Sequence, residues 1–317
     1  MYKGKKVLLI AGGGTLGTYT AEELLRLGAY VDVICPEEKH SHNERLMFYQ
    51  SYATDEFLKE LFSKNHYDGI VNFIHYPDSD DYKPVHKLLS DNTDHLIFLS
   101  SYRVYADLEH PIKETSPRLL DISDDEEFLA KEEYALSKAK AEDFIINESN
   151  TKNWTIVRPV ISFSDRRFDI VTTNQRVIFE YKKLGKTMLL PEGAKNLTAG
   201  LDWAGNTGKL IANLLLKKET LGQTYTISSA QNLTWGEVAE IYTRLIGVKF
   251  EWIDSDEWLN NPECVKSHYA YWGAVYDRFF DRKIDNSKVL KATGLNSDDF
   301  LSIEEGVKIE LDKVNQI

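Results

Sequence analysis

Cysteine is scarce in this sequence, with only Cys35 and Cys264 among 317 residues. Two cysteines are too few for a disulfide framework, so the chain suits a reducing compartment and we expect it to be cytoplasmic. No apolar run approaches the length of a bilayer-spanning helix, and we expect no membrane partner. The opening residues lead directly into an expected core strand, and we therefore expect no signal peptide.

Basic residues are also in deficit. Lys and Arg together number 38 against 50 Asp and Glu, which gives a net charge of −12. Such a charge repels phosphodiester polymers and no basic stripe offsets it, so we expect no nucleic-acid partner. The densest charged run, residues 121–127, is acidic and is typical of a solvated loop. Internal repeats are lacking, and the length suffices for two lobes that share one body.

The sequence does contain a glycine turn between an expected strand and an expected helix. The apolar run 7–10 predicts a buried strand, and apolar residues at helical spacing lead on to a second strand over 31–35. Glycines at such a junction let the backbone approach a pyrophosphate, which the N–H groups of the helix start can bind. A tight turn without a ligand is the alternative. In this context G-x-G-x-x-G predicts a dinucleotide site formed by Gly12, Gly14, Thr15, Leu16 and Gly17.

Alternation of strands and helices continues along the first half of the chain. Strands are expected over 67–74, 95–99 and 154–157, with a helix over 131–148 before the last of them. This order predicts an α/β fold with a doubly wound, Rossmann-like parallel sheet.

Beyond residue 159 the alternation loosens, which favours a smaller α+β lobe of the kind that sets substrate specificity. Helices are expected over 172–184 and 203–217, and Thr234 with Glu237 predicts a capping box at the start of another helix. We therefore expect a dinucleotide-binding domain over residues 1–160, completed by parts of 198–229, and a mainly substrate-binding lobe over 161–317.

Tyr134 and Lys138 lie four residues apart on the helix expected over 131–148, so their side chains share one face. An ammonium near a phenol favours the phenolate and lowers a pKa that is ordinarily about 10. Tyr134 could then act as a base at neutral pH. The spacing alone is common in surface pairs, which is the alternative interpretation.

Ser101 strengthens the catalytic interpretation. It follows the apolar strand over 95–99, at the carboxyl end where open parallel sheets bind ligands. A hydroxyl there can hydrogen-bond the reacting oxygen of a substrate. The glycine turn, Ser101, Tyr134 and Lys138 in this order predict one catalytic set, and the sequence predicts no metal site.

On these residues the chain resembles the extended short-chain dehydrogenase/reductase superfamily, and within it the NAD-dependent epimerase/dehydratase family. The likeness extends through 157–159, 284–288 and 303–306, and so covers nearly the whole chain. The interval between Ile74 and Ser101 is short, as in a compact branch that includes the chloroplast stem-loop-binding proteins. Unlike several relatives in that branch, this chain has the Ser, the Tyr and the Lys.

The resemblance implies chemistry on a sugar hydroxyl. Tyr134 would take the hydroxyl proton, hydride would pass to the nicotinamide, and Ser101 would steady the developing carbonyl. Lys138 would lower the pKa of the tyrosine and bind the nicotinamide ribose. Dehydratases of the family carry Asp-Glu directly after the catalytic hydroxyl residue, where this chain has Tyr102 and Arg103, so we reject dehydration. Many family members form homodimers, which is a further expectation here.

The residues after the second strand leave both NAD and NADP open. Cys35 stands where NAD enzymes place an Asp that binds the ribose. Glu37 and Glu38 would repel the additional phosphate of NADP, whereas Lys39 or Arg45 could attract it. The balance slightly favours NAD.

Further residues are candidates for ligand contacts. Pro159 and His75 follow strands whose ends face the expected cofactor, although a structural role is the favoured alternative for His75. Arg103, Arg166 and Arg167 are candidate substrate contacts, because guanidinium groups bind diphosphates well. For the adjacent pair Arg166 and Arg167, an ordinary surface position is an equal alternative.

The leading hypothesis is an NAD(P)-dependent epimerase that acts on a nucleotide sugar through a transient keto intermediate. A reductase of a keto-sugar or another carbonyl compound, built on the same three residues, is the alternative. A non-enzymatic or RNA-binding relative is a third hypothesis, which the acidic charge and the presence of Ser101, Tyr134 and Lys138 oppose.

Overall fold

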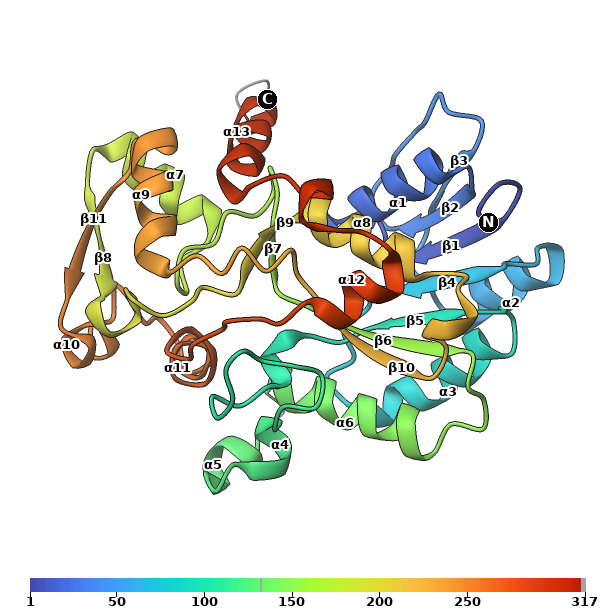
Figure 1. Ribbon diagram of the computed structural model, residues 1–317, viewed down its shortest axis with the longest axis horizontal. Helices are drawn as coiled ribbons and strands as arrows, with labels where there is room; N and C mark the ends of the chain where they lie inside the picture. Colours follow the sequence, from blue (N-terminus) through green and yellow to red (C-terminus); the bar gives the residue numbers. More distant parts are fainter. Residues whose placement is uncertain (132, 315–317) are drawn as a thin grey trace.

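The computed structural model describes residues 1–131 and 133–314, which form a seven-stranded central sheet with helices on both faces (Figure 1). All its neighbouring strands run parallel. The doubly wound α/β fold expected from the sequence is therefore confirmed. In spatial order the strands are β10 (Gln223–Ile227), β6 (Trp154–Pro159), β5 (Leu96–Leu99), β4 (Gly69–Asn72), β1 (Lys6–Ile10), β2 (Tyr30–Cys35) and β3 (Leu46–Gln50).

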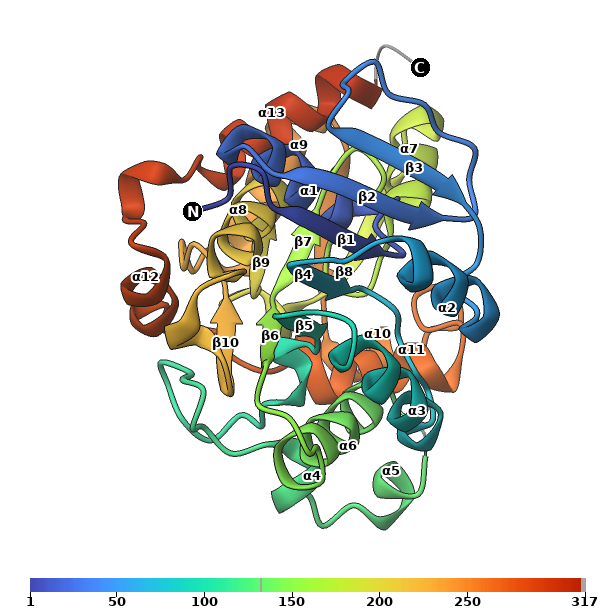
Figure 2. The ribbon, with the colours of Figure 1, turned by 90° about the vertical axis from the view of Figure 1, so that its right-hand side faces the viewer.

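Alternate side chains of β1 enter two different cores, as the period of a strand requires. Val7 and Leu9 belong to the core shared with α1 and α8, whereas Leu8 and Ile10 belong to the core shared with α2. Figure 2 shows the sheet between these two helical layers. The helices of this part are α1 (Thr15–Leu27), α2 (Asp55–Lys64), α3 (Ser79–Ser90), α4 (Leu119–Ile122), α5 (Glu126–Leu129), α6 (Tyr134–Asn147) and α8 (Ala204–Leu214).

A second group of elements lies beside the carboxyl ends of the sheet strands (Figure 1). Two short parallel strand pairs form part of it: β7 (Ile161–Phe163) with β9 (Leu201–Trp203), and β8 (Thr187–Pro191) with β11 (Lys249–Ile253). The helices of this group are α7 (Gln175–Leu184), α9 (Trp235–Ile246), α10 (Ser255–Leu259), α11 (His268–Gly273) and α13 (Ile303–Val314). By contrast, α12 (Ser287–Thr293) packs against α8 and against β10 of the central sheet.

Residues from beyond position 160 return to the central sheet. β10 pairs with β6 at the sheet edge, and α8 packs along α1. The division of the chain into a dinucleotide-binding domain and a substrate-binding lobe stays a prediction. In the described part of the chain, no helix is both long and apolar enough to cross a membrane.

Several helix boundaries differ from the sequence-based expectation. The helix expected from residue 131 begins at Tyr134, because the Glu133 carboxylate accepts a hydrogen bond from the Ala135 N–H and caps the helix there. Residue 132 of that expected helix lies outside the described residues. The helices expected over 172–184 and 203–217 are shorter, over 175–184 and 204–214. The capping box at Thr234 and Glu237 is confirmed.

Close packing of α8 on α1 depends on Gly208, and substitution by Ala tests this contact. An added Cβ would lie 2.7 Å from Tyr19 Cβ and 2.8 Å from Thr20 N. Because this space is filled by backbone, we expect Gly208→Ala to lower the free energy of unfolding by about 1–3 kcal/mol. Urea denaturation measures the effect. Gly273→Ala is the control, since a Cβ there meets nothing within 4 Å; equal stability of the two variants would contradict this view of the contact.

Candidate active site

A pocket of about 420 Å³ opens at the carboxyl ends of the central strands. It lies where β1 and β4 are adjacent, at the point from which the strand order runs in opposite directions. This is the crevice in which doubly wound sheets bind ligands. Its lining includes these residues predicted from the sequence: Gly14, Thr15, Leu16, Gly17, Ser101, Arg103, Tyr134, Pro159 and Arg167. Ser100, Tyr102, Tyr269 and Arg278 also line it.

The glycine turn leaves room for a ligand at one position only among its glycines. A Cβ on Gly17 would collide with the Gly12 carbonyl, one on Gly12 would lie 2.7 Å from Leu9 Cβ, and one on Gly13 would lie 2.6 Å from Cys35 Cβ. At Gly14 a Cβ would meet nothing within 4 Å. The turn is therefore packed tightly on its inner side and open at Gly14, toward the pocket.

The start of α1 fits an anionic group. Gly14 is the N-cap residue, no side chain caps the helix, and its first turn contains no acidic residue. The free N–H groups and the positive end of the helix dipole therefore face the pocket, as pyrophosphate binding requires. The Ser100 hydroxyl, which also lines the pocket, is buried and has no hydrogen-bond partner among the described residues. Both observations fit a bound dinucleotide.

Lys138 lies beneath the pocket on α6, and its side chain is fully buried. The amine donates hydrogen bonds to the Leu99 carbonyl at 2.6 Å and to the Ile74 carbonyl at 3.4 Å. Its Nζ is 5.8 Å from the centre of the Tyr134 ring. Burial lowers the pKa of Lys138 to about 7. At neutral pH the amine is therefore only partly charged.

Residues outside α6 influence the pKa of Tyr134. Burial raises the pKa of Tyr134 above its ordinary value, and the positive charge of Arg103 is the strongest influence that lowers it again, followed by a hydrogen bond with Ser101. The Arg103 guanidinium lies 5.4 Å from the centre of the tyrosine ring. The Lys138 amine faces backbone carbonyls, and the lowering of the Tyr134 pKa by Lys138 that the resemblance implies stays a prediction.

Arg166 and Arg167 lie in different places although they are adjacent in the sequence. Arg166 Nη1 donates to the Gly13 carbonyl at 2.9 Å, over the glycine turn, and Lys39 Nζ donates to the same oxygen at 2.5 Å. Arg167 lines the pocket and pairs with Asp169 at 2.7 Å. Only Arg167 of the pair therefore lines this pocket.

Three other predicted positions lie behind or beside the pocket. The Cys35 side chain packs against Gly13 at the end of β2. His75 Nε2 lies 2.9 Å from the Ser137 hydroxyl, and its ring centre is 4.7 Å from that of Tyr134. Arg45 donates to the Leu25 carbonyl at 2.8 Å near the end of α1. Arg45 is therefore hydrogen-bonded to the protein backbone, away from the glycine turn, and not placed beside the additional phosphate that NADP would carry.

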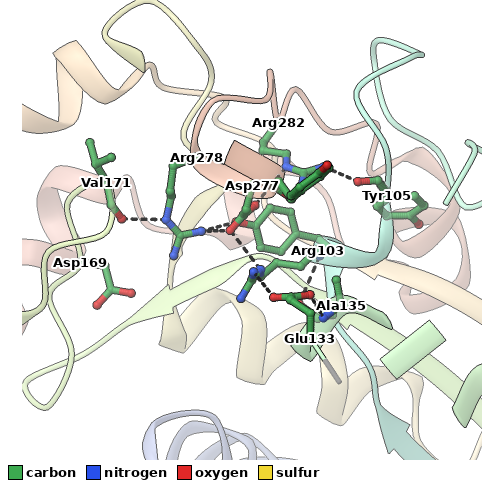
Figure 3. Close-up of polar contacts among 12 residues, drawn as sticks. Arg103, Tyr105, Glu133, Ala135, Asp169, Val171, Asp277, Arg278 and Arg282 are labelled. Atoms are coloured by element: carbon green, nitrogen blue, oxygen red, sulfur yellow. Dashed lines mark hydrogen bonds and ion pairs between the residues drawn. The ribbon is translucent and has the colours of Figure 1, made fainter. Parts of the chain in front are cut away.

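A buried cluster of charged residues beside the pocket was not predicted (Figure 3). We call Arg103, Glu133, Asp277, Arg278 and Arg282 the arginine cluster. Asp277 has no exposed surface; it accepts from Arg282 Nε at 3.1 Å, forms an ion pair with Arg278, and lies 3.4 Å from Arg103 Nε. These residues come from three distant segments and follow no motif. The one sequence signal in this region was that Tyr102 and Arg103 stand where dehydratases of the family carry Asp-Glu.

Comparison with known proteins assigns the chain. The family model described as "NAD dependent epimerase/dehydratase family" matches residues 8–181, more than half of the sequence. The chain belongs to the NAD dependent epimerase/dehydratase family. It is therefore an enzyme of the extended short-chain dehydrogenase/reductase type, and NAD is its cofactor. This agrees with the predicted preference for NAD. No curated protein sequence matches the chain.

Solved structures of the same fold span the whole chain at low sequence identity. Epimerase Mth375 from Methanothermobacter thermautotrophicus has a TM-score of 0.70 at 15% identity, over 99% of this chain and 93% of its own. UDP-glucuronic acid 4-epimerase from Bacillus cereus, solved with UDP-glucuronic acid and NAD, has 0.69 at 14%, over 98% and 99%. The Bordetella bronchiseptica enzyme WbmG, in complex with NAD, has 0.68 at 16%, over 99% and 95%. These likenesses support the fold of this family member.

The buried amine of Lys138 makes stability depend on pH, which tests its environment. Between its folded pKa of about 7 and its ordinary value of 10.5, the unfolded chain holds a proton that the folded chain has lost. The free energy of unfolding should therefore rise with pH across this window, by up to about 1.4 kcal/mol per pH unit. Lys138→Met should remove this contribution. Denaturation of nucleotide-stripped protein should therefore show the parent gaining stability relative to the variant as the pH rises through this window.

Lys140→Met is the matched control, because Lys140 lies on the same helix and is exposed. Its stability should run parallel to that of the parent at every pH. Parallel profiles for Lys138→Met as well would show that the folded protein holds this amine with an ordinary pKa.

Proposed function

We propose that this family member is an epimerase that acts on a nucleotide sugar through a transient keto intermediate. One observation carries the proposal: the Ser101 hydroxyl and the Tyr134 phenol line the same pocket as the open side of the glycine turn. A base and a hydrogen-bond donor then face one substrate oxygen beside the cofactor. The residues after Ser101 are Tyr102 and Arg103, neither of which supplies the acid for an elimination.

The chemistry divides between the cofactor and the side chains of this chain. Bound NAD supplies the reversible hydride acceptor that oxidation of a sugar alcohol requires. Tyr134 takes the hydroxyl proton as the ketone forms and returns it as the alcohol is restored. Ser101 donates a hydrogen bond to the same oxygen and stabilises its developing charge. Lys138, anchored on the Leu99 and Ile74 carbonyls, holds the helix turn that carries Tyr134.

The charge of the pocket supports an anionic substrate. Arg103, Arg167 and Arg278 all line it, and guanidinium groups bind phosphate oxygens in pairs. A nucleotide sugar carries such a group in its diphosphate. Two of the structural neighbours support this class of substrate: one was solved with UDP-glucuronic acid, and WbmG was also solved in complex with NAD and UDP.

Tyr134→Phe tests the proposed base. Loss of the phenol should reduce interconversion of nucleotide sugars by about 10²- to 10⁴-fold, the usual contribution of a general base. The ring remains, so NAD affinity measured by fluorescence titration should change little. The assay follows the sugar products of a nucleotide-sugar panel by chromatography while absorbance reports NADH.

Tyr30→Phe is the control, because Tyr30 is 47% exposed and lies at the amino end of β2, away from the pocket. Parent-like turnover in Tyr134→Phe would exclude Tyr134 as the base. Stoichiometric consumption of NADH by the parent, without sugar inversion, would instead identify a reductase.

A further inference from the structure

Arg103 lies between the two residues proposed to act on the substrate. It belongs to the 3₁₀ turn η1 (Tyr102–Val104) that follows Ser101, and its N–H donates to the Ser101 hydroxyl at 3.2 Å. Its guanidinium lies 5.4 Å from the centre of the Tyr134 ring. The side chain is 13% exposed, so solvent screens its charge only weakly.

Glu133 connects Arg103 to the start of α6. Arg103 Nη2 donates to one Glu133 oxygen at 2.6 Å, and the other oxygen accepts from the Ala135 N–H at 2.5 Å (Figure 3). Tyr134 stands between Glu133 and Ala135 in the sequence. The Glu133 side chain is almost fully buried. The guanidinium, the carboxylate and the helix start therefore form one continuous set of contacts around the tyrosine.

The charge of Arg103 is not fully neutralised by the other acid of the arginine cluster. Asp277 is also shared by Arg278 and Arg282, and it accepts a hydrogen bond from the Tyr102 hydroxyl at 3.1 Å. Arg103 Nε lies 3.4 Å from this carboxylate but has no hydrogen-bond partner among the described residues. Within the arginine cluster, Arg103 is the member whose guanidinium lies over the tyrosine ring.

We propose that Arg103 is a positioning residue for the reaction, which holds Tyr134 at the start of α6 through Glu133 and supplies a permanent positive charge that favours the phenolate. The proposal rests on the proposed role of Tyr134 as the base. This role adds to the one that the family resemblance implies for Lys138.

Other titratable groups also face Tyr134. Burial lowers the pKa of Lys138 to about 7, and partial burial lowers that of His75 to about 4, so the first is only partly charged and the second is neutral at neutral pH. Arg167, which is paired with Asp169, also lowers the pKa of Tyr134, but by less than Arg103 does. Tyr269 of α11 carries no positive charge and acts in the opposite direction. A guanidinium, by contrast, keeps its proton throughout the accessible pH range.

Two substitutions with opposite expected effects test the proposal. Fluorotyrosine is incorporated at position 134 of the NAD-loaded protein, and ¹⁹F NMR follows its ionisation with pH. Arg103→Gln should raise the midpoint by about one pH unit or more, because it removes a weakly screened charge that lies 5.4 Å from the centre of the Tyr134 ring. Glu133→Gln should lower it, because the amide still caps the helix while the negative charge disappears.

If Arg103 had only a structural role, both variants would loosen the start of α6. Their titration midpoints would then move in the same direction or not at all, and either result overturns the proposal. Arg103→Lys should keep the midpoint close to the parent, which separates charge from shape. If Arg103→Gln fails to fold, as circular dichroism would reveal, Glu133→Gln and Arg103→Lys still decide. The titration needs no substrate, so a failure to find a nucleotide-sugar substrate leaves this test intact.

Discussion

The hydrogen bond from the Lys138 amine to the Leu99 carbonyl joins α6 to the end of β5, and the geometry of the site depends on it. Leu99 is two residues before Ser101, and Lys138 is one helical turn after Tyr134. A single 2.6 Å contact therefore fixes the strand end that carries the hydroxyl relative to the helix that carries the phenol. The amine is buried, and the Leu99 and Ile74 carbonyls accept its hydrogen bonds.

The burial that holds Tyr134 in place also opposes its action as a base, because a phenol removed from water holds its proton more firmly. The fold meets this difficulty with charge from outside α6. Arg103 comes from the turn after β5, and Asp277 comes from the far end of the chain. Both contact Glu133 or its partners at the start of the helix, so the second group of elements takes part in setting the environment of Tyr134.

The sequence predicted what is encoded locally. Strand and helix periodicity predicted the parallel sheet, and the glycine pattern predicted a turn at the start of a helix, which the structure places at Gly14 before α1. The arginine cluster was beyond reach, because it joins Arg103, Glu133 and Asp277 across long stretches of chain with no spacing to reveal them. Arg166 and Arg167 were treated as a pair, yet neighbouring residues of an irregular segment point to different sides.

The fate of deuterium at the inverted carbon tests the central claim most directly. NAD-loaded protein is incubated with a nucleotide sugar that carries deuterium in place of the hydrogen removed on oxidation, and the product is examined by mass spectrometry and NMR. A transient ketone within one site predicts an inverted product that retains the deuterium, with no accumulation of NADH. Exchange of the label with solvent, or net conversion of sugar to a ketone or alcohol without inversion, would contradict epimerisation by this protein.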